Sequence, residues 1–485
     1  DNLHLLGPTP ELRDFYVACG MNSKGIGAGG GLGKIMADWV IDGYPSGDIW
    51  ECDVRRTHPV QKSDEYVAER IPEALGHTYD MHWPFYQYET ARNLLLSPLH
   101  ETLTIRGACF GEVGGYERPN WFARGDAEAS YRYSYKRQNW FDFHKAEHLA
   151  VRDSLGIFDM SSFSKFEVSG KGSEAALQYL AVADLKVPIG DVVYTQFLDD
   201  RGGINADLSI VKVGEERFWV ITSIGSHNRD WWHIKQHLRS GVEMADISRE
   251  YACLSLQGPY SRAALAKVSE SEIGSEYFRF GTGRFMLVSG QECWVQRLSY
   301  VGELGFEIFV PAVSAVSVYD ALMQAGAEFE ICDAGMHSLN SLRLEKGFRH
   351  WGHDIGAEDN LIQAGLSFVA KPDVGDFLGR NSLVGQKAAG LPDRRLVQFL
   401  LHDPDPMLYH NEAIIMDGEP VGYLSSAMYG HTLGAAVGMG YVNRVGLSAD
   451  NLVEAAFEIE VAGVRYPAKA SLKGFYDPAG ERMRA

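Results

Sequence analysis

Asp207 is the residue whose type and position most suggest chemistry. The run from 193 to 208 has the pattern of a β-hairpin with its turn at 200–203, which places Asp207 inside the returning strand among apolar neighbours. Strands disfavour aspartate, and a buried carboxylate without a partner is costly. The residue is therefore either a hydrogen-bonded structural acid or a functional group. From these residues alone, the structural interpretation is slightly favoured.

Two further charged residues lie in runs of interest. Glu303 lies in a glycine-flanked turn between two predicted strands, within the run 299–307. It is either a solvated turn acid or a carboxylate that accepts two N–H bonds from a heterocyclic ligand. Arg343 lies in the run 341–347, which ends a predicted helix. It could hold a ligand, although a structural ion pair is the favoured interpretation.

A glycine-rich segment near the N-terminus suggests an anion site. A strand-like run at 15–19 is followed by a glycine-rich turn over 20–33 and by a run with helical spacing at 34–41. A strand, a glycine-rich turn and a helix bring backbone N–H groups and a helix dipole onto an anion. The segment does not fit the pattern GxGxxG, and no βαβ unit with a following acid is visible. A simple tight connection is therefore the favoured alternative.

The elements that must position these residues change along the chain. Residues 58–120 are rich in aromatic residues and punctuated by Pro and Gly, so we expect loops and short strands there. From 158 to 311, strands alternate with helices. From 394 to the end, short alternating strands separated by glycine-rich turns predict a small β-barrel, with a hairpin turn at Asp417-Gly418. Helices are expected at 142–156 and near 173–183, 227–239, 259–268 and 314–326.

Bulk composition limits the class of partner. At 485 residues the chain is long enough for more than one domain, and its 45% apolar and 22% charged content is that of an ordinary soluble globular protein. The net charge of −19 argues against a nucleic-acid or anionic-membrane partner. No apolar run approaches the ~20 residues that cross a bilayer. Six scattered cysteines without a CxxC pair favour reduced thiols, and we expect no metal site.

Together, these runs resemble a known family. The segment from about 145 to 480 is similar to the aminomethyltransferase, or glycine-cleavage T-protein, fold. The resemblance rests on four ordered motifs: Gly-Gly-Ile-x-x-Asp-Leu (202–208), Tyr-x-Gly-Glu-x-Gly-x-Glu (300–307), Ser-Leu-Arg-Leu-Glu-x-Gly (341–347) and Val-Gly-Tyr with Ser-Ser and Tyr-Gly-His after it (421–431).

The N-terminal part resembles a second group of proteins. The run 19–26 looks like the last strand, turn and helix of an FAD-dependent amine oxidoreductase domain. The runs 88–93, 97–100 and 116–122 look like the linker domain of dimethylglycine and sarcosine dehydrogenases.

The two resemblances imply an α+β fold class. A T-protein-like folate-binding α/β domain and a small C-terminal β-barrel would be preceded by the C-terminal edge of an FAD-binding α/β domain. The implied boundaries are 1–57 for the FAD-domain remnant, 58–120 for the linker domain, 121–390 for the folate domain and 391–485 for the barrel.

The resemblance also implies site residues. Asp207 matches the acid beside the folate nitrogens and is the implied catalytic residue, while Tyr194 lines the same pocket. Glu303 matches an acid that grips the pterin ring, and Arg343 completes the implied folate set. The implied FAD contacts are Gly20, Met21, Asn22, Ser23, Gly25 and Ile26.

Two departures from the family pattern shape this interpretation. T-proteins usually carry Arg-Asp just before the Ser-Leu-Arg-Leu-Glu motif, where this chain has Leu339-Asn340, and this favours the dehydrogenase branch. The dinucleotide-binding half of the flavin domain and its flavin-linking histidine are not in the sequence. We therefore expect the C-terminal piece of a longer polypeptide, with a partner subunit that completes the flavin domain as the alternative.

The implied function is folate-linked oxidative demethylation. FAD, completed by residues outside this chain, would oxidise an N-methyl amine such as dimethylglycine or sarcosine. Tetrahydrofolate would trap the iminium or formaldehyde unit as 5,10-methylene-tetrahydrofolate, at a site that must be locally positive in so acidic a chain. The expected location is the cytoplasm, or the mitochondrial matrix in a eukaryote. The alternatives are a stand-alone aminomethyltransferase or folate-binding protein without flavin activity, and a regulatory folate sensor.

Overall fold

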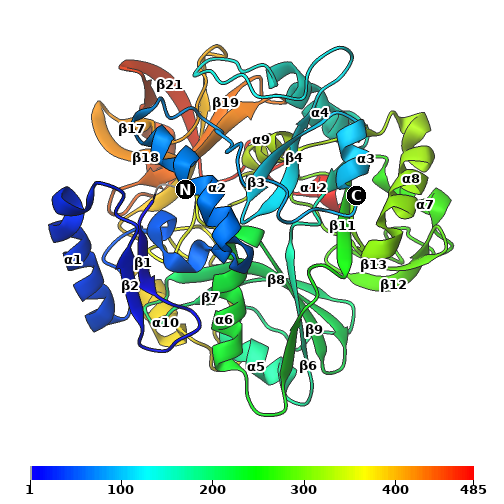
Figure 1. Ribbon diagram of the computed structural model, residues 1–485, viewed down its shortest axis with the longest axis horizontal. Coiled ribbons are helices and arrows are strands. Elements are labelled where there is room, and N and C mark those ends of the chain that lie inside the picture. Colours follow the sequence, from blue (N-terminus) through cyan, green and yellow to red (C-terminus); the bar gives the residue numbers. More distant parts are fainter. Residues whose placement is uncertain (1–2) are drawn as a thin grey trace.

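The computed structural model describes residues 3–485 and begins with a hairpin and a long helix (Figure 1). Strands β1 (Leu5–Pro8) and β2 (Tyr16–Cys19) pair antiparallel, and helix α1 (Gly25–Asp42) follows. The glycines expected to form a turn up to residue 33 lie inside α1, so that expectation was wrong. Each glycine costs a helix only about 1 kcal/mol relative to alanine, so a run of them weakens a helix without forbidding it.

The segment after α1 combines short helices with one small sheet. Helix α2 (Asp64–Gly76) was not anticipated; the hydroxyl of Ser63 caps its N-terminus by accepting from the amide of Tyr66 at 3.1 Å. Helix α3 (His100–Ile105) then leads into the antiparallel pair β3 (Ala108–Val113) and β4 (Tyr116–Phe122). The remainder of this segment is loop and 3₁₀ helix, as the Pro and Gly spacing predicts.

A five-stranded sheet carries the hairpin around Asp207. Its strand order is β10-β6-β9-β8-β7, with antiparallel pairing throughout. The hairpin predicted at 193–208 is the pair β7 and β8. The elements are β6 (Ser164–Ser169), α5 (Ser173–Leu180), β7 (Val192–Leu198), β8 (Ile204–Gly214), β9 (Arg217–Thr222), α6 (His227–His237) and β10 (Glu243–Asp246).

A six-stranded sheet has the order β12-β13-β14-β11-β5-β15. From β11 to β15 the chain repeats the order found from β6 to β10: strand, helix, three strands, helix, strand. Strand β5 (Gly156–Asp159) is inserted between β11 and β15. The other elements are β11 (Tyr251–Gln257), α7 (Ser261–Val268), β12 (Gly283–Val288), β13 (Gln291–Gln296), β14 (Gly305–Pro311), α8 (Ala315–Gly326) and β15 (Cys332–Asp333).

The C-terminal strands close into a barrel, which confirms the predicted architecture. Their order is β16-β19-β18-β17-β20-β21, and the turn at Asp417-Gly418 joins β17 to β18 with a positive φ at both residues. The elements are α10 (Arg380–Ala388), β16 (Arg395–Leu401), β17 (Ala413–Met416), β18 (Glu419–Gly430), β19 (Ala435–Val442), α11 (Ala449–Glu454), β20 (Phe457–Val461), β21 (Val464–Ser471) and α12 (Glu481–Arg484).

Two helices join the sheets to the barrel. Helix α9 (Met336–Lys346) packs against α4 (Phe141–Asp153), against β4 and against β18, and it lies near the centre of the view in Figure 1. The helix predicted at 142–156 is α4. Between residues 3 and 485, no helix has both the length and the apolarity to cross a membrane.

Candidate active site

The β7–β8 hairpin places Tyr194 and Asp207 on one face of the sheet. Gln196 lies directly opposite Asp207, and Tyr194 lies opposite Ser209, so Tyr194 and Asp207 are diagonal neighbours across the strands. The turn that fixes this register is held by Asp199, whose Oδ1 accepts from the amides of Arg201 at 2.9 Å and Gly203 at 2.8 Å. The β7–β8 hairpin therefore brings together Tyr194 and Asp207, the two residues that the resemblance assigns to one pocket.

The carboxylate of Asp207 is held by a neutral donor. Gln196 Nε2 donates to Asp207 Oδ1 at 2.7 Å, and no ion pair of Asp207 is found within residues 3–485. Burial raises the pKa of Asp207 to about 6, while hydrogen bonds from Gln196 and Tyr194 and the charge of Arg349 act in the opposite direction. An acid with a pKa near neutrality can exchange a proton at physiological pH or stabilise a nearby cation as its anion.

Tyr194 is partly exposed beside Asp207. The residue is 40% exposed, while burial of its hydroxyl raises the pKa of that group well above the usual value, with the charge of Asp207 as the next cause. A partly exposed aromatic ring next to a carboxylate can contact a heterocyclic ligand.

Tyr300 lies near Asp207. The charge of Asp207 is among the causes that raise the pKa of Tyr300, after burial. The ring of Tyr300 stacks on Phe348 with centroids 5.9 Å apart, and its hydroxyl donates to the carbonyl of Arg349 at 2.8 Å. The segment that carries Phe348 and Arg349 is thereby tied to the motif at 300–307.

Glu303 lies in a buried ion-pair network. Its Oε1 accepts from Arg152 Nη1 at 3.2 Å and from the hydroxyl of Tyr476, and its Oε2 accepts from Arg482 Nε at 2.7 Å. The donors predicted to come from a ligand are here protein groups. The geometry therefore favours a structural role for Glu303, in which it ties the C-terminal segment to the six-stranded sheet.

Arg343 is also fully engaged within the protein. It is buried on α9, and its guanidinium forms an ion pair with Asp354 and donates to Asn340 Oδ1 at 2.7 Å and to Ser426 Oγ at 3.0 Å. These contacts connect α9 to the barrel strand β18. They favour the structural ion pair over direct ligand binding.

Glu307 is an acid that the sequence reasoning missed. It lies on β14, and Gln296 Nε2 on β13 donates to its Oε2 at 2.7 Å. Burial raises its pKa, and no cation is paired with it in the described part of the chain. The signal was available, because Glu307 is a carboxylate inside an apolar strand, as Asp207 is. It closes the same motif that contains Glu303.

The predicted flavin contacts form one exposed turn. Gly20, Asn22 and Ser23 have φ values of 71°, 41° and 67°, and α1 begins two residues after Ser23. Ile26 is fully exposed, and the first turn of α1 contains no acidic residue. Backbone N–H groups at such a helix start can bind an anion. A side chain at Gly25 would meet Met21, so the two residues approach closely in this turn.

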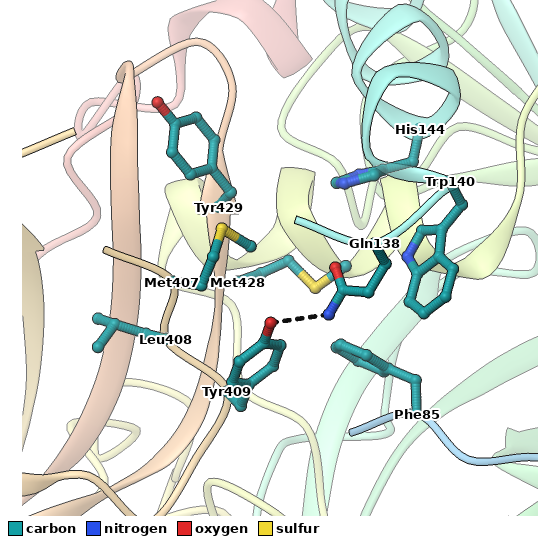
Figure 2. A pocket seen from close by; sticks show the side chains of 9 residues that line it. All are labelled: Phe85, Gln138, Trp140, His144, Met407, Leu408, Tyr409, Met428 and Tyr429. Atoms are coloured by element: carbon teal, nitrogen blue, oxygen red, sulfur yellow. Dashed lines mark hydrogen bonds between the residues drawn. The ribbon is translucent and has the colours of Figure 1, made fainter. Parts of the chain in front are cut away.

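A separate small pocket lies between the barrel, the loop before α4 and the segment containing Phe85 (Figure 2). Gln138 Nε2 donates to the hydroxyl of Tyr409 across it at 2.8 Å. Its cavity of about 10 Å³ holds no more than one water, so it cannot be the site of a heterocyclic ligand. Among residues 3–485, no cluster of three or more histidine, cysteine or acidic side chains could hold a metal ion.

Comparison with known families assigns most of the chain. The GCVT N-terminal domain matches residues 99–373, which is more than half of the chain, and the glycine cleavage T-protein C-terminal barrel domain matches 394–477. The chain belongs to the glycine cleavage T-protein family. This T-protein-family chain also carries a match to the FAD dependent oxidoreductase central domain at 42–97. The family and fold class expected from the motifs are confirmed.

Two similar curated proteins are longer than this T-protein-family chain. It is 42% identical over 99% of its length to 4-methylaminobutanoate oxidase (formaldehyde-forming) of Paenarthrobacter nicotinovorans, and 34% identical over its full length to mitochondrial sarcosine dehydrogenase of Homo sapiens. The chain spans 58% and 57% of those two proteins. The aminomethyltransferase T of the glycine cleavage system from Bartonella henselae has the same fold, with a TM-score of 0.68, 23% identity and coverage of 80% of this chain and 99% of that one.

Proposed function

We propose that this chain is the folate-binding part of an FAD-dependent N-methyl amine dehydrogenase. In this proposal the amine resembles sarcosine, dimethylglycine or 4-methylaminobutanoate, and its one-carbon unit leaves as 5,10-methylene-tetrahydrofolate. The observation that carries the proposal is Asp207, an acid with a raised pKa that Gln196 holds in place beside the partly exposed Tyr194. The family match of the surrounding motifs supports folate as the ligand.

The residues around Asp207 fit a folate. Bound tetrahydrofolate would supply the nitrogen that takes up the one-carbon unit. Asp207 would accept an N–H bond from that nitrogen in addition to the bonds from Gln196 and Tyr194, and its charge would stabilise the cation that develops. Glu307 is the better candidate for the second ring contact, since Glu303 is saturated by Arg152 and Arg482.

The N-terminal turn would contribute one edge of an FAD site. In this proposal Gly20, Met21, Asn22, Ser23, Gly25 and Ile26 contact the cofactor. The positive φ values and the helix start without an acid support an anionic group at this position. The remaining flavin contacts would come from residues outside this chain. The predicted domain boundaries and location, in the cytoplasm or the mitochondrial matrix, remain parts of the proposal.

The test is capture of formaldehyde by tetrahydrofolate. The purified chain is expected to bind tetrahydrofolate and to speed its conversion to the 5,10-methylene form above the uncatalysed rate. Asp207→Asn should lower that rate about ten- to hundredfold, the value of a hydrogen bond to a charged group. Asp200→Asn, at the exposed turn of the same hairpin, is the matched control and should have no effect.

Two results would decide against the proposal. Equal capture rates for Asp207→Asn and the unchanged chain would remove the assigned role of Asp207. Absence of flavin absorbance near 450 nm in the protein isolated with all its natural segments and partners would favour a stand-alone aminomethyltransferase or folate-binding protein.

A further inference from the structure

Strand β8 contains a β-bulge just before Asp207. Leu198 on β7 pairs with Ile204, whereas the residue before Leu198 pairs with Ala206. Asn205 is therefore the extra residue of a bulge between β7 and β8. Such a bulge bends the strand, increases its twist and changes the direction of the side chains that follow it. The position of Asp207, two residues further along, depends on how this bulge is held.

Both backbone polar groups of Ile204, at the edge of the bulge, are bound by the segment that follows α9. The indole N–H of Trp351 donates to the carbonyl of Ile204 at 2.9 Å. The amide of Ile204 donates to the carbonyl of Asp359 at 2.9 Å. A buried hydrogen bond contributes about 1 kcal/mol and is costly to leave unmade. These bonds fix β8 on one side of the bulge, and the hydrogen bond from Gln196 fixes Asp207 on the other side.

Trp351 is itself held by two other side chains. The guanidinium carbon of Arg229 on α6 lies 3.3 Å from the ring centroid of Trp351 and 4.9 Å from that of Trp50. The two indole rings meet edge to face, with centroids 4.6 Å apart. Cation–π contacts and edge-to-face aromatic pairs each contribute roughly 0.5–2 kcal/mol. Trp50, Arg229 and Trp351 together form what we call the tryptophan–arginine stack.

Arg229 connects this stack to the five-stranded sheet. Its Nε and Nη2 donate to Asp230 Oδ1 at 3.1 Å and 2.9 Å. Asp230 Oδ2 in turn accepts from the hydroxyl of Thr222 on β9 at 2.7 Å. Arg229 and Asp230 are both buried. Because this carboxylate orients the guanidinium, Arg229 has a fixed position over Trp351.

Trp50 reaches the stack from the N-terminal part of the chain. It lies within 42–97, the segment that matches the FAD dependent oxidoreductase central domain. Gly352 has a φ of 87°, and a Cβ there would lie 3.0 Å from Trp50 Nε1, so glycine is what permits this approach. A second contact joins the same regions, because the guanidinium carbon of Arg201 in the hairpin turn lies 3.3 Å from the ring centroid of Tyr44. The N-terminal segment therefore contacts the elements that hold the β7–β8 hairpin.

We infer that Trp351 is a positioning residue for Asp207, and that Trp50 extends this control to the N-terminal segment. The indole N–H holds the edge of the bulge, the stack holds the indole, and β8 transmits the constraint to Asp207. Trp351 acts through the strand and has no contact with the ligand. The inference takes only the role of Asp207 from the proposed function.

The first test is hydrogen exchange measured on the whole chain without a ligand. Trp351→Phe keeps a ring in the stack but removes the N–H, whereas Trp50→Leu removes one ring and keeps that bond. Trp351→Phe should speed exchange of the amides from 204 to 209 about fivefold, the value of one hydrogen bond, and Trp50→Leu should act in the same direction. Exchange in the barrel strand β19 should not change.

The matched control is Trp232→Phe on α6, which should leave exchange at 204–209 as it is, since Trp232 contacts Lys235 on its own helix. Unchanged exchange at 204–209 in both Trp351→Phe and Trp50→Leu would overturn the inference. Equal acceleration in β19 would mean a general loss of stability and would also overturn it. If Trp351→Phe does not fold, Trp50→Leu alone decides between these results.

The second test is the capture of formaldehyde by tetrahydrofolate. Trp351→Phe should lower kcat about fivefold and leave KM for tetrahydrofolate within about twofold, because a displaced Asp207 loses stabilisation of the developing cation. The acidic limb of the pH profile should move to higher pH, since a weaker bond from Gln196 raises the pKa of Asp207. A change in KM alone would contradict a positioning role.

The two tests separate the two proposals. If the unchanged chain does not capture formaldehyde, the proposed function fails, while hydrogen exchange still decides whether Trp351 holds the strand. If capture occurs and Trp351→Phe leaves both kcat and the pH profile unchanged, the proposed function stands and the inference is wrong.

Discussion

Gln196 holds Asp207 by a 2.7 Å hydrogen bond from its Nε2 across the β7–β8 hairpin. The oxygen of the same amide, Gln196 Oε1, is buried without a donor among the described residues. A neutral donor keeps the acid oriented and favours its anion without cancelling its negative charge. An arginine in the same place would cancel that charge. The pair Gln296 and Glu307 has the same arrangement on β13 and β14, again at 2.7 Å.

The first prediction concerns Gln196→Met, which keeps the volume of the side chain but removes the donor. Burial already raises the pKa of Asp207, and the hydrogen bond from Gln196 lowers it, so the loss should raise the pKa further. If the anion of Asp207 is the active form, the acidic limb of the pH–rate profile for formaldehyde capture should move up by roughly one pH unit. An unchanged profile with an unchanged melting temperature would contradict this.

The second prediction is that Glu303→Gln mainly destabilises the fold. It breaks a buried network with Arg152 and Arg482, and removal of one partner of a buried pair costs about 3–5 kcal/mol. Urea unfolding should report that loss, while tetrahydrofolate affinity measured under folding conditions should change little. The matched control is Glu460→Gln, which breaks a half-exposed pair with Arg465 and should cost under about 1 kcal/mol. A selective loss of folate affinity would instead indicate that Glu303 contacts the ligand.

The third prediction is a loss of stability in mild acid from buried histidines. Burial lowers the pKa of His337 and of His431 to about 3, below the usual 6.5. Between these two values the unfolded chain binds more protons than the folded one. Their contribution is therefore complete above about pH 6.5 and falls as the pH drops toward 3, by up to about 1.4 kcal/mol per pH unit for each histidine.

The measurement is urea unfolding at several pH values from 7 to 4.5. His431→Phe should reduce the slope of stability against pH, because one titrating group is removed from the cluster with His144. An identical slope in this variant would show that other groups control acid unfolding.

The fourth prediction tests the unexpected start of α1. An added Cβ would touch nothing at Gly30 or Gly31, so alanine at both positions should stabilise the helix by up to about 1 kcal/mol per residue. Hydrogen exchange of the amides from 26 to 34 should slow in the double variant. If exchange there is fast in both proteins, these glycines are not helical in solution.

The parts of the fold that the sequence predicts best are those with regular periodicity or specific turns. The hairpin at 193–208, the helix at 142–156 and the Asp417-Gly418 turn all follow from local pattern. The start of α1 was missed because its glycines were interpreted as a turn. Glycine disfavours a helix only weakly, so a run of glycines does not by itself exclude one. Helix α2 was hidden by its aromatic and proline-containing surroundings.

The site was predicted in part for a similar reason. Asp207 and Tyr194 are neighbours because their two strands pair, and the sequence pattern of a hairpin predicts that pairing. The partners of Glu303 come from residues 152 and 482, and those of Arg343 come from residues 354 and 426. These contacts join residues that are far apart in the chain. The sequence around an acid therefore does not show whether its carboxylate is already paired within the protein or is available to a ligand. Glu307 left a local signal as a carboxylate inside an apolar strand, but only the fold shows that it has no ion pair among the described residues.

The repeated order of elements in the two sheets has an evolutionary meaning. It is what duplication and fusion of one ancestral half would leave, with β5 inserted into the second copy. Gln196 and Asp207 lie on the second and third strands of their half, whereas Gln296 and Glu307 lie on the third and fourth strands of theirs. The two amide–acid pairs therefore occupy different positions in the repeated unit and are not copies of one another.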